Sequence, residues 1–179
     1  PPQSAENHAH IRIFTPGTEL PFAGHPTIAA AHTLISEGRV ALAPGESLRL
    51  ETGAGVIPVE VTAGEQPLYT MTQVAPQFRP SEFDRATIAA CLGLEARDVL
   101  VTEWVSTGIF WLLAQIASIE AMMRARPNTI AILKIPHGLS IFCIGARQPA
   151  ADIHVRAFAP EAGVFEDPVT GSSNGCIAA

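Results

Sequence analysis

The sequence predicts an α+β fold made of two similar halves, each with strands wrapped around a central, buried helix. Three observations predict this fold. A helical pattern over residues 26–35 (PTIAAAHTLI) is apolar on most sides, which is typical of a helix surrounded by other elements. Strand patterns at residues 47–52, 55–62 and 68–74 have the close spacing of an antiparallel meander. A segment near the N-terminus is repeated near the C-terminus, which indicates pseudo-twofold symmetry.

The composition narrows the class of protein before any motif is considered. The chain has 179 residues, of which 47% are hydrophobic and 16% charged, so it can build a core and is not disordered. Its net charge of −6 argues against a nucleic-acid partner, and no uninterrupted apolar run is long enough to span a membrane. The three cysteines are too scattered for a disulfide framework, which favours a cytoplasmic protein.

The elements before the middle of the chain are expected as follows. Residues 8–15 (HAHIRIFT) alternate and predict a strand. In the first helix Pro26 stands in the first turn, and Gly38 follows its end. After the meander, Ser81 is the expected N-cap of a second helix, which reaches Leu92 before Gly93.

The elements of the second part begin with a hairpin. Residues 99–107 and 109–116 predict two strands joined around Gly108, and their tryptophans, Trp104 and Trp111, are expected in the core. The remaining expected elements are one helix and two strands, at residues 119–124, 140–146 and 153–158.

The internal repeat carries the functional prediction. Residues 10–16 (HIRIFTP) and 154–160 (HVRAFAP) lie 144 positions apart and share four of seven residues. Each leads through a loop to a glycine that opens a helix rich in small residues, Gly24 in the first copy and Gly171 in the second. We therefore expect both helix starts to face one cleft.

Backbone N–H groups and a partial positive charge make a helix start a site for anions. Gly171, Ser172 and Ser173 are expected to bind a substrate carboxylate, with simple helix capping by Ser or Asn as the structural alternative. Gly24 opens the other helix next to His25, where the helix dipole favours neutral imidazole, which can relay a proton. A structural role for His25 stays open.

Asp167 lies four residues before Gly171 and could orient a substrate amine or share a proton with His25. Its alternative is a solvated loop acid beside Glu166. His8 and His10 share a strand face, but without a third ligand we expect no metal site, and metal-assisted hydrolysis is the weakest hypothesis.

Three segments resemble the phenazine-biosynthesis PhzF family: residues 12–16 (RIFTP), 19–27 (ELPFAGHPT) and 166–172 (EDPVTGS). The resemblance extends from Ile11 to Ala179. It implies the diaminopimelate-epimerase-like fold, with the active site between the two halves, and a homodimeric isomerase that needs no cofactor. In the phenazine pathway the substrate is trans-2,3-dihydro-3-hydroxyanthranilate, along whose ring a proton moves.

The resemblance also assigns residues. His25, Asp167 and Ser172 match the family's active-site positions. Relatives that act as racemases or epimerases have paired cysteines at the two helix starts, where this chain has His25 and Ser172, so a two-cysteine racemase is disfavoured.

The family's acid–base glutamate precedes the position of Ile11, and Glu6 does not match it. We therefore expect residues 1–75 to form most of the first half without its N-terminal part. Residues 76–179 would form the connection and the start of the second half, without its C-terminal part. A truncated or non-catalytic PhzF-like protein that binds a small molecule is the alternative function.

Overall fold

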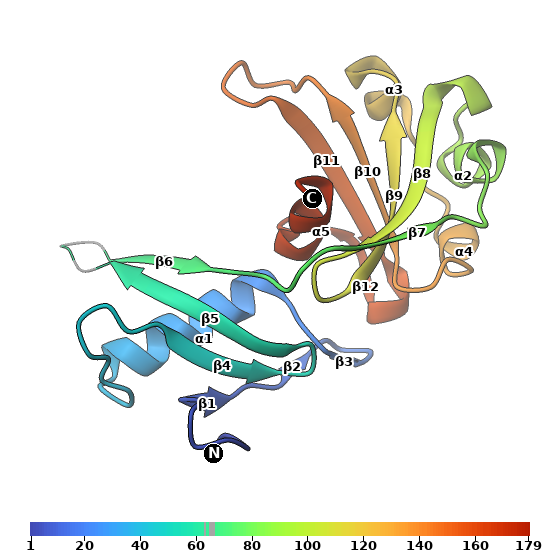
Figure 1. The fold of residues 1–179 in the computed structure, drawn as a ribbon. Coiled ribbons are helices and arrows are strands. Elements are labelled where there is room, and N and C mark those ends of the chain that lie inside the picture. Colours follow the sequence, from blue (N-terminus) through green and yellow to red (C-terminus); the bar gives the residue numbers. More distant parts are fainter. Residues whose placement is uncertain (63, 65–66) are drawn as a thin grey trace. The chain divides into compact units, whose positions relative to one another are not determined.

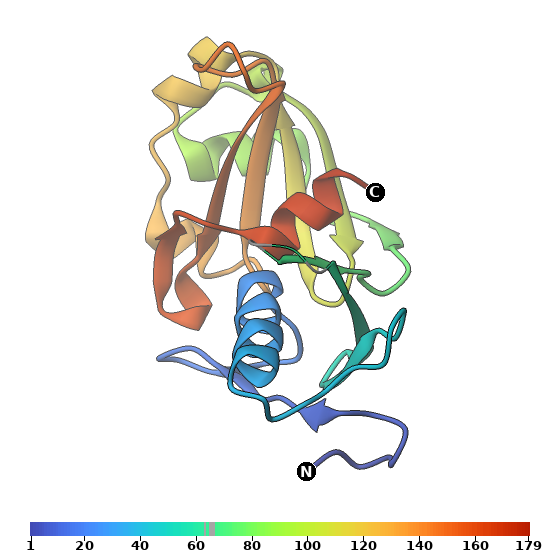
Figure 2. The same cartoon turned by 90° about the vertical axis from the view of Figure 1, so that its left-hand side faces the viewer.

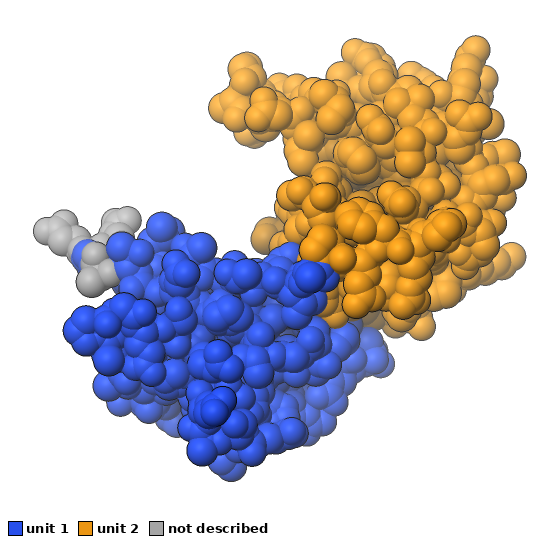
Figure 3. All heavy atoms as spheres, viewed as in Figure 1, with its two compact units in different colours: residues 1–75 blue, residues 76–179 orange. Residues whose placement is uncertain are grey.

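The computed structural model describes residues 1–62, 64 and 67–179. The chain divides into two compact units, Pro1–Ala75 and Pro76–Ala179 (Figure 3). Among the described residues, no helix combines the length and the apolar character needed to cross a membrane.

Unit 1 contains a four-stranded sheet in the order β1-β4-β5-β6 (Figure 1). Its strands are β1 (Ala9–His10), β4 (Leu48–Thr52), β5 (Gly55–Thr62) and β6 (Leu68–Met71). The last three are antiparallel in sequence order, which confirms the predicted meander, and β1 pairs with β4 in parallel. The bounds of β5 are those predicted.

Helix α1 (Gly24–Ser36) packs on this sheet beside β4 and β6 (Figure 1 and Figure 2). Its buried side includes Thr27 and Ala31, whereas Ala29, His32 and Thr33 are exposed. The expectation of a helix surrounded by strands is therefore met on one side only, because the strands of the sheet all lie on that side. Fully buried residues complete this core: Phe22, Leu48, Leu50, Ile57 and Val59.

The strand expected over residues 8–15 is wrong as a single element. It is divided into β1 and β2 (Ile13–Phe14), and β2 forms a hairpin with β3 (Glu19–Leu20). The division occurs where the chain changes partner. The Ile11 N–H still donates to the Glu51 carbonyl at 2.9 Å, and two residues later Ile13 pairs with Leu20.

Unit 2 contains a six-stranded sheet in the order β12-β11-β10-β9-β8-β7. The hairpin β8 (Val99–Ser106) and β9 (Phe110–Ile116) confirms the prediction. Strands β10 (Leu139–Ile144) and β11 (Ile153–Ala159) form close to their predicted positions, and β9 pairs with β10 in parallel. The edge strands β7 (Gln77–Pro80) and β12 (Val164–Asp167) were not predicted.

The helices cover opposite faces of this sheet, with α5 (Gly171–Ile177) in front of it and α2 (Arg85–Leu92) behind it in Figure 2. Residues of α3 (Ile119–Arg124) and α4 (Thr129–Ile132) join the same core as α2. Side chains alternate between the faces, as the pleat requires. Trp104 and Leu112 pack with α2, and Trp111 packs with α5.

The starts of these helices show one correction. Ser81 is not an N-cap: its hydroxyl accepts from the Phe83 N–H in a turn, and Asp84 caps α2 by accepting from the Thr87 N–H at 2.8 Å. Gly93 ends the helix as predicted, with a positive φ of 64°.

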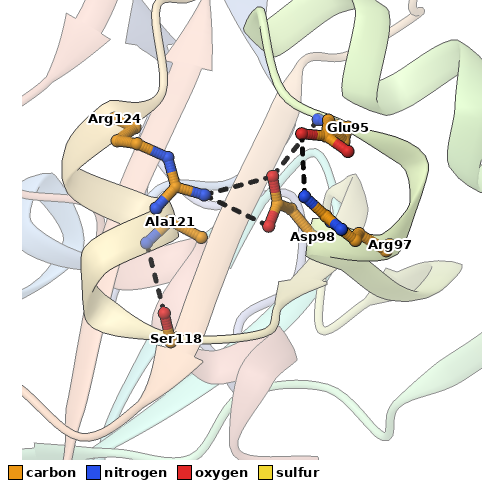
Figure 4. A network of polar contacts seen from close by, with 6 residues as sticks. All are labelled: Glu95, Arg97, Asp98, Ser118, Ala121 and Arg124. Carbon is orange, nitrogen blue, oxygen red and sulfur yellow. Dashed lines mark hydrogen bonds and ion pairs between the residues drawn. The ribbon is translucent and has the colours of Figure 1, made fainter.

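A polar network joins two neighbouring elements of unit 2 (Figure 4). The Arg124 guanidinium of α3 donates to both Asp98 carboxylate oxygens, at 3.2 and 3.3 Å. Asp98 belongs to the short helix η1 (Ala96–Asp98) and also accepts from the Glu95 N–H. Ser118 caps α3 through the Ala121 N–H.

Candidate active site

The loop before α1 is fixed by two neighbours of Gly24. Phe22 is fully buried in the core of unit 1. Pro21 lies against the turn between β4 and β5, where a Cβ on Gly53 would come within 2.8 Å of the Pro21 Cα, so only glycine fits without displacement. The Pro21 carbonyl also accepts from the Ala54 N–H at 3.0 Å. These contacts determine where the helix begins.

The start of α1 offers a ligand the His25 imidazole and two backbone N–H groups. Gly24 is buried, and His25, the second residue of the helix, is exposed. The N–H groups of the first turn have no acceptor in their own helix, but Pro26 has no N–H to contribute. The groups available to a ligand are therefore the N–H groups of Gly24 and His25 and the His25 imidazole.

The start of α5 is reached through a hairpin that repeats the one before α1. Ile13 pairs with Leu20 in the β2–β3 hairpin, and Ala157 pairs with Asp167 in the β11–β12 hairpin. The paired residues are related by the same offsets as the sequence repeat, 144 and 147 positions.

Each hairpin also carries the same ion pair. Arg12 donates to both carboxylate oxygens of Glu19, at 2.9 and 2.8 Å, and Arg156 does the same to Glu166, at 2.7 and 3.0 Å. Each guanidinium also lies over the phenylalanine two residues later. The repeat inferred from the sequence is therefore a repeat of structure, including its side-chain contacts.

Asp167 is the last residue of β12 and is half-buried. One of its carboxylate oxygens accepts from the Val169 N–H at 3.1 Å, which orients the side chain in the turn before α5. Glu166 points to the opposite side of the strand, toward Arg156. The neighbouring carboxylates therefore differ: Glu166 is held in an ion pair, and within residues 1–62, 64 and 67–179 the second oxygen of Asp167 accepts no hydrogen bond.

Ser172 is held by a residue from the sheet. The indole N–H of Trp111 donates to Ser172 Oγ at 3.0 Å. Ser173 is fully buried, and its hydroxyl lies 2.5 Å from that of Ser140. The side chain of Ser173 is thus engaged inside unit 2, and the group it can offer a ligand is its backbone N–H. With Gly171 and Ser172, the start of α5 provides three N–H groups and one hydroxyl.

Thr170 precedes this helix and is unusual. Its hydroxyl is buried and has no hydrogen-bond partner within residues 1–62, 64 and 67–179. An unpaired buried hydroxyl is unfavourable for stability.

The predicted residues fall into two groups. Gly24 and His25 belong to unit 1, and Asp167, Gly171, Ser172 and Ser173 lie within seven consecutive residues of unit 2. An open cavity of about 590 Å³ in unit 2 is lined by Asp167 and Glu166, but Ser172 does not line it.

His8, which was considered as a metal ligand, has contacts with protein groups. His8 accepts from the Arg49 N–H at 3.0 Å and lies 3.4 Å from Glu46. In the described part of the chain, no three His, Cys, Asp or Glu side chains form a group that could hold a metal ion.

Burial raises the pKa of all three cysteine thiols, which makes them poor nucleophiles at neutral pH: Cys91, Cys143 and Cys176.

Sequence reasoning missed the contact between Trp111 and Ser172. It assigned Trp111 to the core, and the residue is indeed 5% exposed. The available signal was chemical, because a buried indole N–H needs an acceptor. The partner lies 61 residues later, so the pairing could not be predicted from local pattern.

Comparison with known proteins gives a consistent result. A family model described as phenazine biosynthesis-like protein (PhzC-PhzF) matches residues 1–179. The chain is 32% identical over 179 residues to an uncharacterised isomerase of Bacillus subtilis, covering 94% of this chain and 60% of that protein. It is 33% identical over 178 residues to the trans-2,3-dihydro-3-hydroxyanthranilate isomerase of Pseudomonas aeruginosa, covering 97% of this chain and 59% of that protein.

Solved structures that resemble this chain support the same family and fold. The crystal structure of a PhzF-family phenazine biosynthesis protein from Bacillus anthracis matches with a TM-score of 0.76 and 29% identity, over 94% of this chain and 60% of that one. A hydroxyproline epimerase from Agrobacterium vitis matches with a TM-score of 0.67 over 99% of this chain and 56% of that one; at 13% identity it supports the fold alone. The predicted α+β, epimerase-like fold is confirmed. The chain spans about 60% of the length of these relatives.

Proposed function

The chain belongs to the PhzC/PhzF family of phenazine biosynthesis-like proteins, and from this premise we propose that the whole protein is a cofactor-independent isomerase. Its substrate would be a small cyclic or amino-acid-like carboxylate on which one proton is moved. Such a reaction breaks one C–H bond and forms another, with no net transfer of electrons, so it requires no redox cofactor. The relatives from Bacillus subtilis and Pseudomonas aeruginosa are named as isomerases, which supports this class of reaction.

The substrate carboxylate is assigned to the start of α5. This site offers the N–H groups of Gly171, Ser172 and Ser173 together with the Ser172 hydroxyl, whereas the start of α1 lacks one N–H because of Pro26. The Ser172 hydroxyl carries the proposal, because its oxygen accepts from the Trp111 indole N–H and, within the described residues, its proton has no acceptor and can be donated to a carboxylate.

His25 and Asp167 are assigned to the reacting part of the substrate. The exposed His25 imidazole has the chemistry of a general acid or base, and Gly24 lets a ligand approach the backbone closely. The second oxygen of Asp167 can accept a hydrogen bond from a substrate amine. The substrate of the Pseudomonas aeruginosa relative, a dihydro-hydroxyanthranilate, has both a carboxylate and an amine, and we propose a substrate of this kind.

The test is turnover of trans-2,3-dihydro-3-hydroxyanthranilate by the whole protein in D₂O, with deuterium incorporation followed by mass spectrometry. We expect His25→Asn and Asp167→Asn to reduce turnover by about 100-fold or more, as is usual for groups that transfer or direct protons. His32→Asn, on the exposed side of the same helix, and Asp152→Asn, an exposed acid elsewhere, are the matched controls.

Full turnover in the His25 and Asp167 variants would contradict the assigned roles. Binding without deuterium incorporation would instead favour the non-catalytic binding protein.

We also propose a homodimer located in the cytoplasm, as the family resemblance and the unpaired cysteines suggest. Light scattering of the purified whole protein tests the dimer, and a monomeric mass would contradict it.

A further inference from the structure

We propose that Trp111 is a positioning residue that directs the Ser172 hydroxyl proton toward the substrate carboxylate. This inference rests on the proposed function, because it assumes that Ser172 contacts a carboxylate. It adds a residue that lies outside the three family-like segments, on the sheet strand β9.

The first step of the argument is the direction of the hydrogen bond. An indole N–H can only donate, so Ser172 Oγ must be the acceptor in the 3.0 Å contact with Trp111 Nε1. The Ser172 proton therefore points elsewhere, and within the described part of the chain the hydroxyl has no other hydrogen-bond partner. Ser172 is half-buried, so part of this residue is exposed to a ligand.

The second step is the rigidity of the donor. Trp111 is 5% exposed and packs closely against Gly138. A Cβ added to Gly138 would come within 2.9 Å of the indole Cζ3 of Trp111. The Gly138 carbonyl accepts from the Leu112 N–H at 3.2 Å, so the same glycine also binds the backbone of β9. The indole therefore has little freedom to turn away from Ser172.

The third step is the rigidity of the helix. The next residue, Ser173, is bound to Ser140 of the adjacent strand β10 at 2.5 Å, and both side chains are fully buried. The first turn of α5 is thus attached to neighbouring strands at two consecutive residues. A donor to Ser172 Oγ also polarises the hydroxyl, which strengthens the hydrogen bond that it gives to an anion.

The other tryptophan provides a matched control. Trp104 is 8% exposed, lies on the neighbouring strand β8, and donates its indole N–H to Glu82 at 2.7 Å. Trp104→Phe therefore removes a similar ring and an indole hydrogen bond without touching Ser172. Residues 1–179 contain two tryptophans, Trp104 and Trp111. Each Trp→Phe variant removes one indole N–H signal and thereby assigns it.

The first experiment is NMR of the indole N–H groups in the whole protein, with anthranilate as the carboxylate probe. Without ligand, Ser172→Ala should move the Trp111 signal and leave the Trp104 signal in place. Anthranilate should move the Trp111 signal saturably, and this response should disappear in Ser172→Ala. An unchanged Trp111 signal in both measurements would overturn the proposal, whatever the activity of the protein.

The second experiment is a kinetic double-mutant cycle. We expect Trp111→Phe to raise KM by about two- to tenfold, the usual effect of losing one hydrogen bond, while Trp104→Phe leaves KM unchanged. In the Ser172→Ala background, Trp111→Phe should have no further effect. An equal effect in both backgrounds would show a merely structural role and would overturn the proposal. Absence of turnover in the wild type would contradict the proposed function and leave the NMR result to decide this inference.

Discussion

Replacing Gly138 by alanine should destabilise the protein strongly. Gly138 has a φ of 110°, in the region that side chains rarely adopt. Its Cβ would lie 2.6 Å from the Phe158 carbonyl oxygen and 2.9 Å from Trp111 Cζ3, closer than side chains normally approach. Neither neighbour can move easily, because Phe158 is fully buried and paired in the sheet and Trp111 is bound to Ser172.

The expected loss has two parts. Backbone strain at such a position costs about 1–3 kcal/mol, and overpacking a filled core adds about 1–3 kcal/mol. The free energy of unfolding should therefore fall by roughly 2–6 kcal/mol in Gly138→Ala.

Gly145→Ala separates these parts. Gly145 has a similar φ of 90°, but its Cβ would meet no atom within 4 Å. This variant should lose only the strain contribution, about 1–3 kcal/mol. The difference between the two variants measures the overlap at Gly138.

The assay is urea unfolding followed by circular dichroism and by tryptophan fluorescence. Gly138→Ala should also change the emission of Trp111 in the native protein, and Gly145→Ala should leave it unchanged. Equal destabilisation by both variants, with unchanged emission, would refute the reasoning, because the overlap would then have no cost and Trp111 would not be confined.

Three further predictions concern other parts of the chain. A double-mutant cycle on the half-buried Arg156–Glu166 pair should give a coupling of about 1 kcal/mol, and the more exposed Arg12–Glu19 pair should give less, as measured by urea unfolding at low salt. Thr170→Val should leave stability unchanged or raise it by up to about 1 kcal/mol, because it removes an unpaired buried hydroxyl; a clear loss in thermal unfolding would reveal a partner. The hydrogen bond from the Gln3 N–H and those from Asn7 and Ser4 lower the pKa of Glu51. The ionised carboxylate therefore stabilises the fold at any pH above the pKa that Glu51 has in the unfolded chain. This contribution to stability is lost as the pH falls through the lower pKa of the folded protein. Glu51→Gln should thus be destabilising at pH 7, and a difference from wild type that persists in acid would contradict this assignment.

Local pattern was sufficient to predict most elements of the fold. The strand β5, the β8–β9 hairpin and the helix α1 are strongly apolar segments with a glycine beside one end: Gly55 begins β5, Gly108 lies between β8 and β9, and Gly38 follows α1. The edge strand β7 was missed because all of its residues are exposed, so it has no alternation to detect. The break between β1 and β2 follows from a change of pairing partner, which a local pattern does not contain.

The candidate site shows the same limit. His25, Asp167 and Ser172 lie in recognisable motifs, so the sequence could predict them, and their roles remain predictions. Trp111 could not be assigned in this way, because its link to Ser172 depends on how α5 packs on β9. The buried pairing of Ser173 with Ser140, which leaves only its N–H for a ligand, also required the structure.

The repeat bears on the proposed isomerase reaction. His25 and Ser172 are both the second residue of their helices and are related by the offset of 147 positions that also relates Glu19 to Glu166. The same hairpin, with the same arginine–glutamate pair, therefore precedes two chemically different side chains. A racemase interconverts mirror images and benefits from two equivalent bases. Under the proposed function, unequal groups would suit a substrate whose two ends differ: a hydroxyl with three N–H groups would bind the carboxylate, and an imidazole would transfer the proton.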